Sequence, residues 1–212
     1  MKGRFSSHPF WGNYSPLSSL AGAGIIIMAS SRLAFALVCA GALVWVYGLT
    51  ALVYSSARSI MPSRGKGVIL LFLSAFFCGL YNILIGLLNP LLILGTFFPL
   101  FLIPPLCLAS GFFTAAESED TIESVSRATL EAFILSGILI AISLIREPLG
   151  MGTISIPGSA QGIIELFDSH NVESIIPGRI FSVSAGGLLL LGYLVALYRY
   201  FKERNFSVSE EE

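Results

Sequence analysis

Long apolar stretches separated by short polar segments dominate the chain. A helix that crosses a bilayer needs about 20 mainly apolar residues. Six stretches reach or approach this length, at about 10–28, 33–54, 67–88, 90–116, 128–145 and 180–201. The pattern predicts an all-α integral membrane protein with six transmembrane helices in one domain over residues 1–204. The polar residues 205–212 are predicted to form a disordered tail.

Composition supports this interpretation. Of the 212 residues, 55% are hydrophobic and only 12% are charged, whereas about 25% of the residues in a typical soluble domain are charged. A net charge of −1 gives no indication of a nucleic-acid partner. All three cysteines lie in apolar stretches, which is not the pattern of a secreted disulfide framework. Polar and helix-breaking residues between 11 and 16 interrupt any early apolar core, so no cleaved signal peptide is predicted.

The distribution of basic residues predicts the orientation in the membrane. Positive residues are enriched on the cytoplasmic side of membrane proteins. If both termini are cytoplasmic, nine of the twelve basic residues lie inside: Lys2, Arg4, Arg58, Arg64, Lys66, Arg127, Arg199, Lys202 and Arg204. Arg32, Arg146 and Arg179 then lie outside. We therefore expect a multi-pass protein of the cell (inner) membrane with cytoplasmic N- and C-termini.

The six predicted spans divide into two halves, at about 10–88 and 90–202. Each half contains an odd number of spans, so the halves have opposite orientations. The first span of each half is interrupted by glycines and prolines, and Pro16–Gly22 (PLSSLAG) is similar to Pro105–Gly111 (PLCLASG). Interrupted segments at corresponding positions are typical of inverted repeats with a site near the bilayer midplane. The sequence thus predicts two inverted three-helix repeats with broken first and fourth helices.

Cys107 is the first candidate site residue. It follows Pro104 and Pro105, which remove two backbone donors and break the helix. Irregular backbone at membrane depth is tolerated only where it is buried in protein or lines a cavity, so a thiol there could face a specific partner. A free cysteine is also a small buried hydrophobe, and this is the interpretation that we favour for Cys39 and Cys78. No Cys-x-x-Cys pair exists, so the chain cannot hold an iron–sulfur cluster alone.

Glu131 is the second candidate, predicted to lie about one turn inside the fifth span. An acidic side chain at membrane depth is costly and indicates ion or proton movement. The alternative is an interfacial role, in which Glu131 reaches headgroup water or pairs with Arg127 four residues earlier. Asn82 is a candidate for a hydrogen bond to a neighbouring helix. No catalytic constellation is present, so the chain is not expected to be an enzyme by itself.

The segment Arg146–Thr153 (REPLGMGT) carries a charge pair and two glycines at the end of the fifth span. We expect a sharp turn here, followed by an amphipathic stretch along the membrane surface to about Arg179.

Three segments together resemble one known family. Arg146–Thr153 resembles the Arg-Glu-x-Leu-Gly-x-Gly-Thr signature of the E subunit of Rnf complexes and the D subunit of Nqr. Phe98–Gly111 is similar to the fourth helix of that family, in which a cysteine follows Pro-Leu. Tyr14–Leu17 (YSPL) is similar to its first-helix Leu-Cys-Pro-Leu. The matches occur in the same order over nearly the whole chain.

This resemblance implies a membrane subunit of an ion-translocating ferredoxin/NAD oxidoreductase of the Rnf type. Such a subunit relays electrons across the bilayer and contributes to coupled Na⁺ or H⁺ transport. Its implied partners are membrane lipid, a paralogous six-helix A-type subunit and the other Rnf-type subunits. The two paralogues are thought to share one [2Fe-2S] cluster, to which each gives two cysteines, one from its first helix and one from its fourth. Cys107 matches the fourth-helix ligand, and no flavin is expected on this chain.

Ser15 stands where the family has its first-helix cysteine. A hydroxyl is a poorer ligand for iron than a thiolate. Ser15 could be an unusual ligand, another cysteine could replace it, or the cluster could be lost, leaving a structural or ion-path role. Two other functions stay open from sequence: a small inverted-repeat transporter or permease, and a cofactor-free assembly subunit.

Overall fold

The computed structural model describes residues 19–58, 60, 65–110, 121–158, 163–168, 179–193 and 196. These residues fold mainly into helices. The helices are α1 (Leu20–Ala29), α2 (Leu33–Ala57), α3 (Lys66–Leu88), α4 (Pro90–Phe101), α5 (Ile103–Ala109), α7 (Thr121–Met151) and a helix over Ser184–Tyr193. A 3-10 helix, η2 (Arg179–Ser182), and two strands, β1 (Thr153–Pro157) and β2 (Ile163–Asp168), complete the described elements.

Four helical segments are long and apolar enough to cross a membrane: α2, α3, α4 with α5, and α7. This confirms the prediction of a largely helical chain with several helices that are long and apolar enough to span a membrane. Two further apolar helices, α1 and Ser184–Tyr193, are shorter, and much of the first and last predicted spans lies outside the described residues. The six-span inverted repeat, its orientation and the tail at 205–212 stay predictions.

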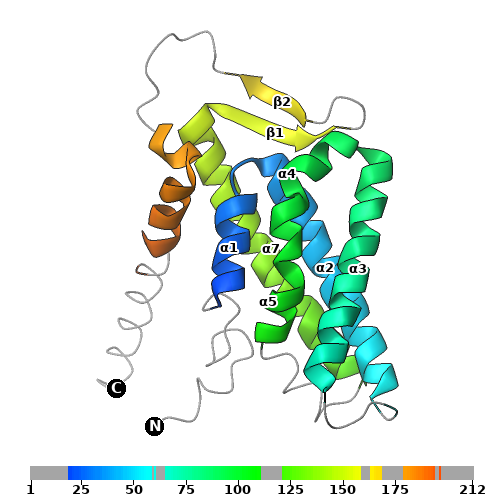
Figure 1. Cartoon of the computed structure of the whole chain (residues 1–212). Coiled ribbons are helices and arrows are strands. Elements are labelled where there is room, and N and C mark those ends of the chain that lie inside the picture. Colours follow the sequence, from blue (N-terminus) through cyan, green and yellow to red (C-terminus); the bar gives the residue numbers. More distant parts are fainter. Residues whose placement is uncertain are drawn as a thin grey trace, which may run out of the picture.

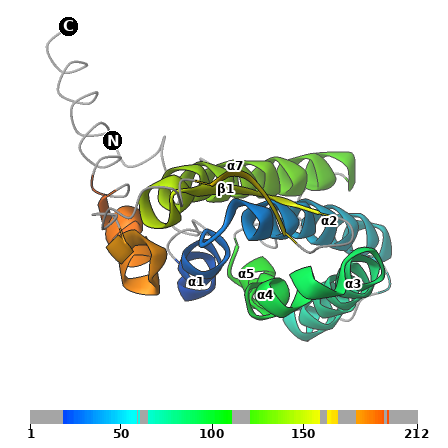
Figure 2. The ribbon, with the colours of Figure 1, turned by 90° about the horizontal axis from the view of Figure 1, so that it is seen from above.

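The helices form a bundle in which α2 and α7 lie side by side (Figures 1 and 2). Viewed from above, α1, α4–α5 and α3 line up against this pair (Figure 2). Alanines form much of the α2–α7 contact; Ala36, Ala42 and Ala132 are fully buried in the main core cluster. Small side chains let two membrane helices approach closely, which increases their packing contacts.

The strands correct the all-α prediction. β1 and β2 form an antiparallel pair across one end of the bundle, with Ile154 opposite Phe167 and Ile156 opposite Ile164 (Figure 1). We had expected this stretch to be an amphipathic surface segment. The alternation of isoleucine with polar Ser155 is the period-two pattern of a strand, and pairing with β2 satisfies its backbone.

The sharp turn expected within Arg146–Thr153 is found at the second glycine of this segment and not at the charge pair. Helix α7 continues through Pro148 to Met151, and the chain turns only at Gly152, whose φ is +68°. The helix continues past the charge pair because both side chains are bound by neighbouring elements. Arg146 and Glu147 are each only 1% exposed.

The Arg146 guanidinium joins α1 to the last described segment. It donates to the Ile27 carbonyl at 2.5 Å, the Ser30 hydroxyl at 2.8 Å, and the carbonyls of Phe181 at 2.7 Å, Ser182 at 3.3 Å and Val183 at 3.0 Å. Because the last carbonyls of a helix have no intrahelical donor, the buried guanidinium supplies donors where α1 ends. It thereby fixes the end of α1 against the segment that leads into Ser184–Tyr193.

Glu147 joins α7 to α2 and the hairpin. Its carboxylate accepts from the Leu33 backbone N–H at 2.6 Å and from the Thr153 hydroxyl at 3.4 Å. A carboxylate at a helix N-terminus satisfies an orphan donor and complements the helix dipole. The adjacent residues Arg146 and Glu147 thus bind the end of α1 and the start of α2, respectively.

Candidate functional site

The fourth predicted span is broken as the sequence indicates. Helix α4 ends at Phe101 and α5 begins at Ile103. Pro104 lies in the first turn of α5, where a backbone N–H would have no intrahelical acceptor. The Leu100 carbonyl, whose α-helical donor would be Pro104, instead accepts from the Cys78 thiol at 3.2 Å. The break therefore lies against α3 and directs α5 into the core.

Helix α5 places Cys107 inside the bundle, where it is 2% exposed. Its thiol lies beside Tyr47 of α2 and within electrostatic reach of Glu131 of α7. Tyr47 also neighbours Ser110, whose hydroxyl donates to the Cys107 carbonyl at 2.9 Å. The structure thus brings together the two candidates that the sequence predicted separately, and it adds Tyr47.

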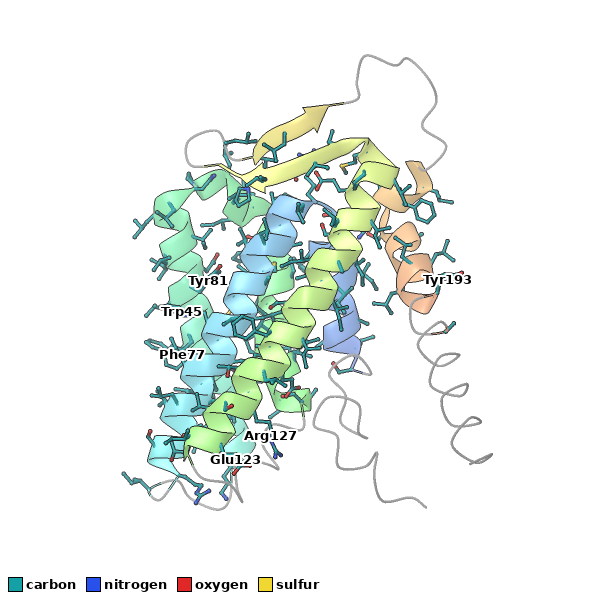
Figure 3. The ribbon with its side chains drawn as sticks, turned by 180° about the vertical axis from the view of Figure 1, so that it is seen from behind. Trp45, Phe77, Tyr81, Glu123, Arg127 and Tyr193 are labelled. Carbon is teal, nitrogen blue, oxygen red and sulfur yellow. The ribbon has the colours of Figure 1, made fainter. Side chains whose placement is uncertain are left out.

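Glu131 lies deeper than the sequence indicated. Helix α7 begins at Thr121, ten residues earlier, which is a rise of about 15 Å. The residue is 3% exposed, and its Oε1 has no hydrogen-bond partner among the residues that the structure describes. Arg127 forms an ion pair with Glu123 instead, at 3.9 Å, near the start of α7 (Figure 3). The carboxylate therefore faces the core and not the helix end.

The surroundings of Glu131 supply oxygen atoms rather than cations. The Tyr47 hydroxyl, like Glu131 Oε1, has no hydrogen-bond partner of suitable geometry within the described part of the chain. Carboxylate and hydroxyl oxygens are suitable groups for binding a proton or a hard cation. Neither the helix break nor the position of Glu131 in the sequence pointed to Tyr47, because Tyr47 lies in an uninterrupted apolar helix.

The three cysteines belong to one core cluster. Cys39, Cys78 and Cys107 are all free and buried and lie within the same group of packed side chains. The Cys78 thiol lies near those of both Cys39 and Cys107. In the sequence, Cys39 and Cys78 lie in two uninterrupted apolar helices, and Cys107 follows the break in a third. Only the packing of these helices brings the three cysteines together.

The [2Fe-2S] cluster shared between subunits stays a prediction. Within residues 19–58, 60, 65–110, 121–158, 163–168, 179–193 and 196, no three His, Cys, Asp or Glu side chains are grouped to hold a metal ion, but a shared cluster would take only two ligands from this chain. Cys107 is packed among the chain's own side chains. The proposed second ligand, Ser15, lies outside the described residues.

A crevice of about 120 Å³ lies between α3 and the broken α4–α5 segment. Its mainly apolar lining includes Cys78, Gly79, Asn82 and Pro104. The Asn82 Oδ1 atom is buried and has no hydrogen-bond partner within the described ranges. No bond from this oxygen to a neighbouring helix is formed there, although the sequence had suggested Asn82 for such a role.

Comparisons with known proteins give no family for the chain: no model of a known protein family matches it, and no curated protein does.

Proposed function

We propose that the chain is an ion-translocating membrane subunit of an electron-transport complex of the Rnf/Nqr type. In this proposal Glu131 takes up and releases the transported proton or Na⁺. The observation that carries the proposal is the buried Glu131 carboxylate, with one oxygen unpartnered in the described structure. Burying an ionisable group in a membrane bundle is costly, and such groups mark ion pathways.

The position of Glu131 supports this role. It is contributed by α7 and approaches side chains of α2 and α5, so the carboxylate lies where three helices meet. Helix α5 follows the break at Leu102 and is only seven residues long. A short segment beside a break can shift with less loss of backbone hydrogen bonding than a continuous helix, so its movement could change the surroundings of Glu131.

The redox part of the proposal rests on the family resemblance. Electrons would enter and leave through partner subunits, and the chain would not be catalytic alone. Cys107 and Ser15 remain the candidate ligands for a shared [2Fe-2S] cluster. Iron and acid-labile sulfide measured on the intact complex, with paramagnetic resonance of Cys107→Ser, test this part. An unchanged signal in the variant would remove Cys107 as a ligand.

Ion transport by the purified complex tests the role of Glu131. The complex is captured through a tag on this chain, reconstituted into vesicles and driven by electron donor and acceptor. We expect Glu131→Gln to co-purify with the same subunits but to lower ion uptake per electron transferred by about 10-fold or more. Glu123→Gln on the exposed start of α7 is the matched control and should retain uptake. Unchanged uptake in Glu131→Gln, or purification without redox subunits, would refute the proposal.

A small permease is the second candidate function, and the crevice between α3 and α4–α5 favours it. A broken helix beside a cavity is the arrangement in which many transporters hold substrate. Neighbouring genes distinguish the two functions. Genes for a paralogous six-helix protein, a flavin-bearing subunit and a ferredoxin-like subunit favour the redox complex, and a gene for a soluble binding protein favours transport.

A further inference from the structure

Four buried polar side chains on α2 and α7 have atoms with no hydrogen bond of standard geometry in the described structure, although the Tyr47 hydroxyl also lies close to Ser110 and Cys107 at the end of α5. The atoms are the Tyr47 hydroxyl, Thr50 Oγ1, Ser124 Oγ and Glu131 Oε1. Their residues are 1%, 1%, 1% and 3% exposed, respectively. Nearly all buried polar groups in native proteins are hydrogen-bonded to protein or to ordered water, so the concentration of four such atoms at one interface needs an explanation.

The register of the two helices places these atoms toward one end. The contacts Leu33–Glu147 and Ala40–Ser136 show that α2 and α7 run antiparallel. Farther along, a Cβ atom on Gly48 would lie 3.4 Å from Thr129 Cγ2. Thr50 and Ser124 therefore lie between Glu131 and the end of the bundle at which α2 finishes and α7 starts.

Immediately beyond Glu131 on the other side, the described buried side chains are apolar or hydrogen-bonded. Leu43, Leu135 and Leu139 are buried in the main core there. The Ser136 hydroxyl donates to the Ala40 carbonyl at 3.1 Å. Ser143 Oγ is also unpartnered within the described ranges, but it is twelve residues from Glu131, a rise of about 18 Å along α7.

We infer that water enters the α2–α7 interface from the end formed by Ala57 and Thr121 and reaches Glu131 past Ser124, Thr50 and Tyr47. Water would satisfy each of these hydroxyl groups, which would otherwise be buried without a hydrogen-bond partner at a cost in stability. The leucine layer closes the route beyond Glu131. The passage thus gives Glu131 access to one side of the membrane, the side that the basic residues predict to be cytoplasmic.

This inference depends on the proposed function only for the role that the passage would have. That role is to deliver a proton or hydrated cation to Glu131. In an alternating-access mechanism, the ion-binding site is open to only one side of the membrane at a time. The ion binds from one side, and a change at the broken α4–α5 segment would be needed before it leaves on the other. The presence of water along the α2–α7 interface can be tested without any transport measurement.

Thiol labelling in membrane vesicles tests the passage. Single cysteines are introduced as Thr50→Cys and Ser124→Cys in a chain whose Cys39, Cys78 and Cys107 are replaced by alanine. Leu139→Cys and Ser136→Cys, beyond Glu131 on α7, are the matched controls. Because only the ionised thiol reacts, we expect a charged methanethiosulfonate reagent to label the first two about 100-fold faster than the controls.

Infrared spectroscopy of the natural chain provides a second measurement that needs no cysteine replacement. We expect the carboxyl band that is lost in Glu131→Gln to shift promptly on transfer to heavy water. Absence of both labelling and exchange would overturn the passage. Labelling of the control positions at the same rate would also overturn it, because it would indicate a continuous pore.

The passage and the proposed function can fail separately. Fast labelling at Thr50→Cys with undiminished ion uptake by Glu131→Gln would leave the passage and refute the function. Loss of uptake in Glu131→Gln with a dry α2–α7 interface would leave the function and refute the passage.

Discussion

The Glu147 carboxylate accepts a hydrogen bond from the backbone N–H of Leu33 at 2.6 Å, across 114 residues of sequence. This bond fixes the start of α2 against the end of α7. Together with the Arg146 guanidinium it closes the end of the bundle that lies under the hairpin. The other end of the same helix pair contains Ser124 and Thr50, so the two ends of the α2–α7 pair have different chemistry.

Replacing Glu147 by alanine should destabilise the protein by about 1–3 kcal/mol, because the partly buried Leu33 N–H loses its acceptor. Glu147→Gln should cost less, since the amide oxygen can still accept. Reversible unfolding in mixed detergent micelles measures both. Glu165→Ala is the control, because its ion pair with Arg32 is partly exposed and should contribute less than about 1 kcal/mol. Equal losses in Glu147→Ala and Glu165→Ala would contradict the capping role.

Arg146→Met should be more destabilising, at about 3 kcal/mol or more, because the deeply buried guanidinium is lost and its five acceptors lose a charged donor. Arg146→Lys should rescue only part of this loss, since an ammonium group has three donors and no planar fork. Thermal unfolding of the purified proteins ranks the stabilities of the natural chain, Arg146→Lys and Arg146→Met. Arg32→Met, at the partly exposed start of α2, is the control. A stability of Arg146→Met close to that of Arg32→Met would show that the guanidinium is not required.

Two glycines should be intolerant of alanine for steric reasons. A Cβ on Gly150 would lie 2.6 Å from the Ser182 backbone nitrogen, and one on Gly187 would lie 2.9 Å from Arg146 Nη1. Since helical alanine is otherwise favoured by up to about 1 kcal/mol, Gly192→Ala, which meets nothing within 4 Å, should be neutral or stabilising. Melting temperatures of the three variants check this expectation. Equal temperatures for Gly150→Ala and Gly192→Ala would refute the close packing.

Asn89 should couple the turn before α4 to the hairpin. Its Oδ1 accepts from the backbone N–H groups of Leu91 and Leu92 at 3.1 and 3.3 Å, and its Nδ2 donates to the Gly158 carbonyl. Asn89→Asp keeps the cap but loses the donor to Gly158, whereas Asn89→Ala loses both.

We expect Asn89→Ala to lower stability by about 1–2 kcal/mol and both variants to increase protease cleavage at the hairpin. Ser56→Ala, whose exposed hydroxyl bonds only within α2, is the control for cleavage. A hairpin that is cleaved no faster in Asn89→Asp than in the natural chain would contradict the coupling to Gly158.

Several parts of the fold could be predicted from local pattern. The apolar lengths predicted the α2 and α3 spans closely, and the prolines predicted the break before Cys107. The β-hairpin was missed because five residues of alternation are a weak signal beside long apolar helices. The course of α7 past Pro148 was missed because the backbone groups that bind Arg146 and Glu147 belong to residues more than thirty or more than one hundred positions away.

The candidate site shows the same division. The sequence singled out Cys107 by its prolines and Glu131 by its charge in an apolar helix, because each is a local anomaly. It could not show that both residues lie close to Tyr47, because a tyrosine in an uninterrupted apolar helix is not unusual for its sequence context. It also could not show that Arg127 would pair with Glu123 and leave Glu131 in the core.

The sequence by itself determined that the chain has several helices long and apolar enough to span a membrane, the extent of α2 and α3, and where one helix breaks. Chain hydrophobicity and proline act within one segment, so their consequences can be read from that segment alone. Only the tertiary structure decided which side chains meet: Arg146 with the end of α1, Glu147 with the start of α2, and Glu131 with Tyr47 and Cys107. These contacts depend on the rotation and register of packed helices, which are set by the fit of many side chains at once.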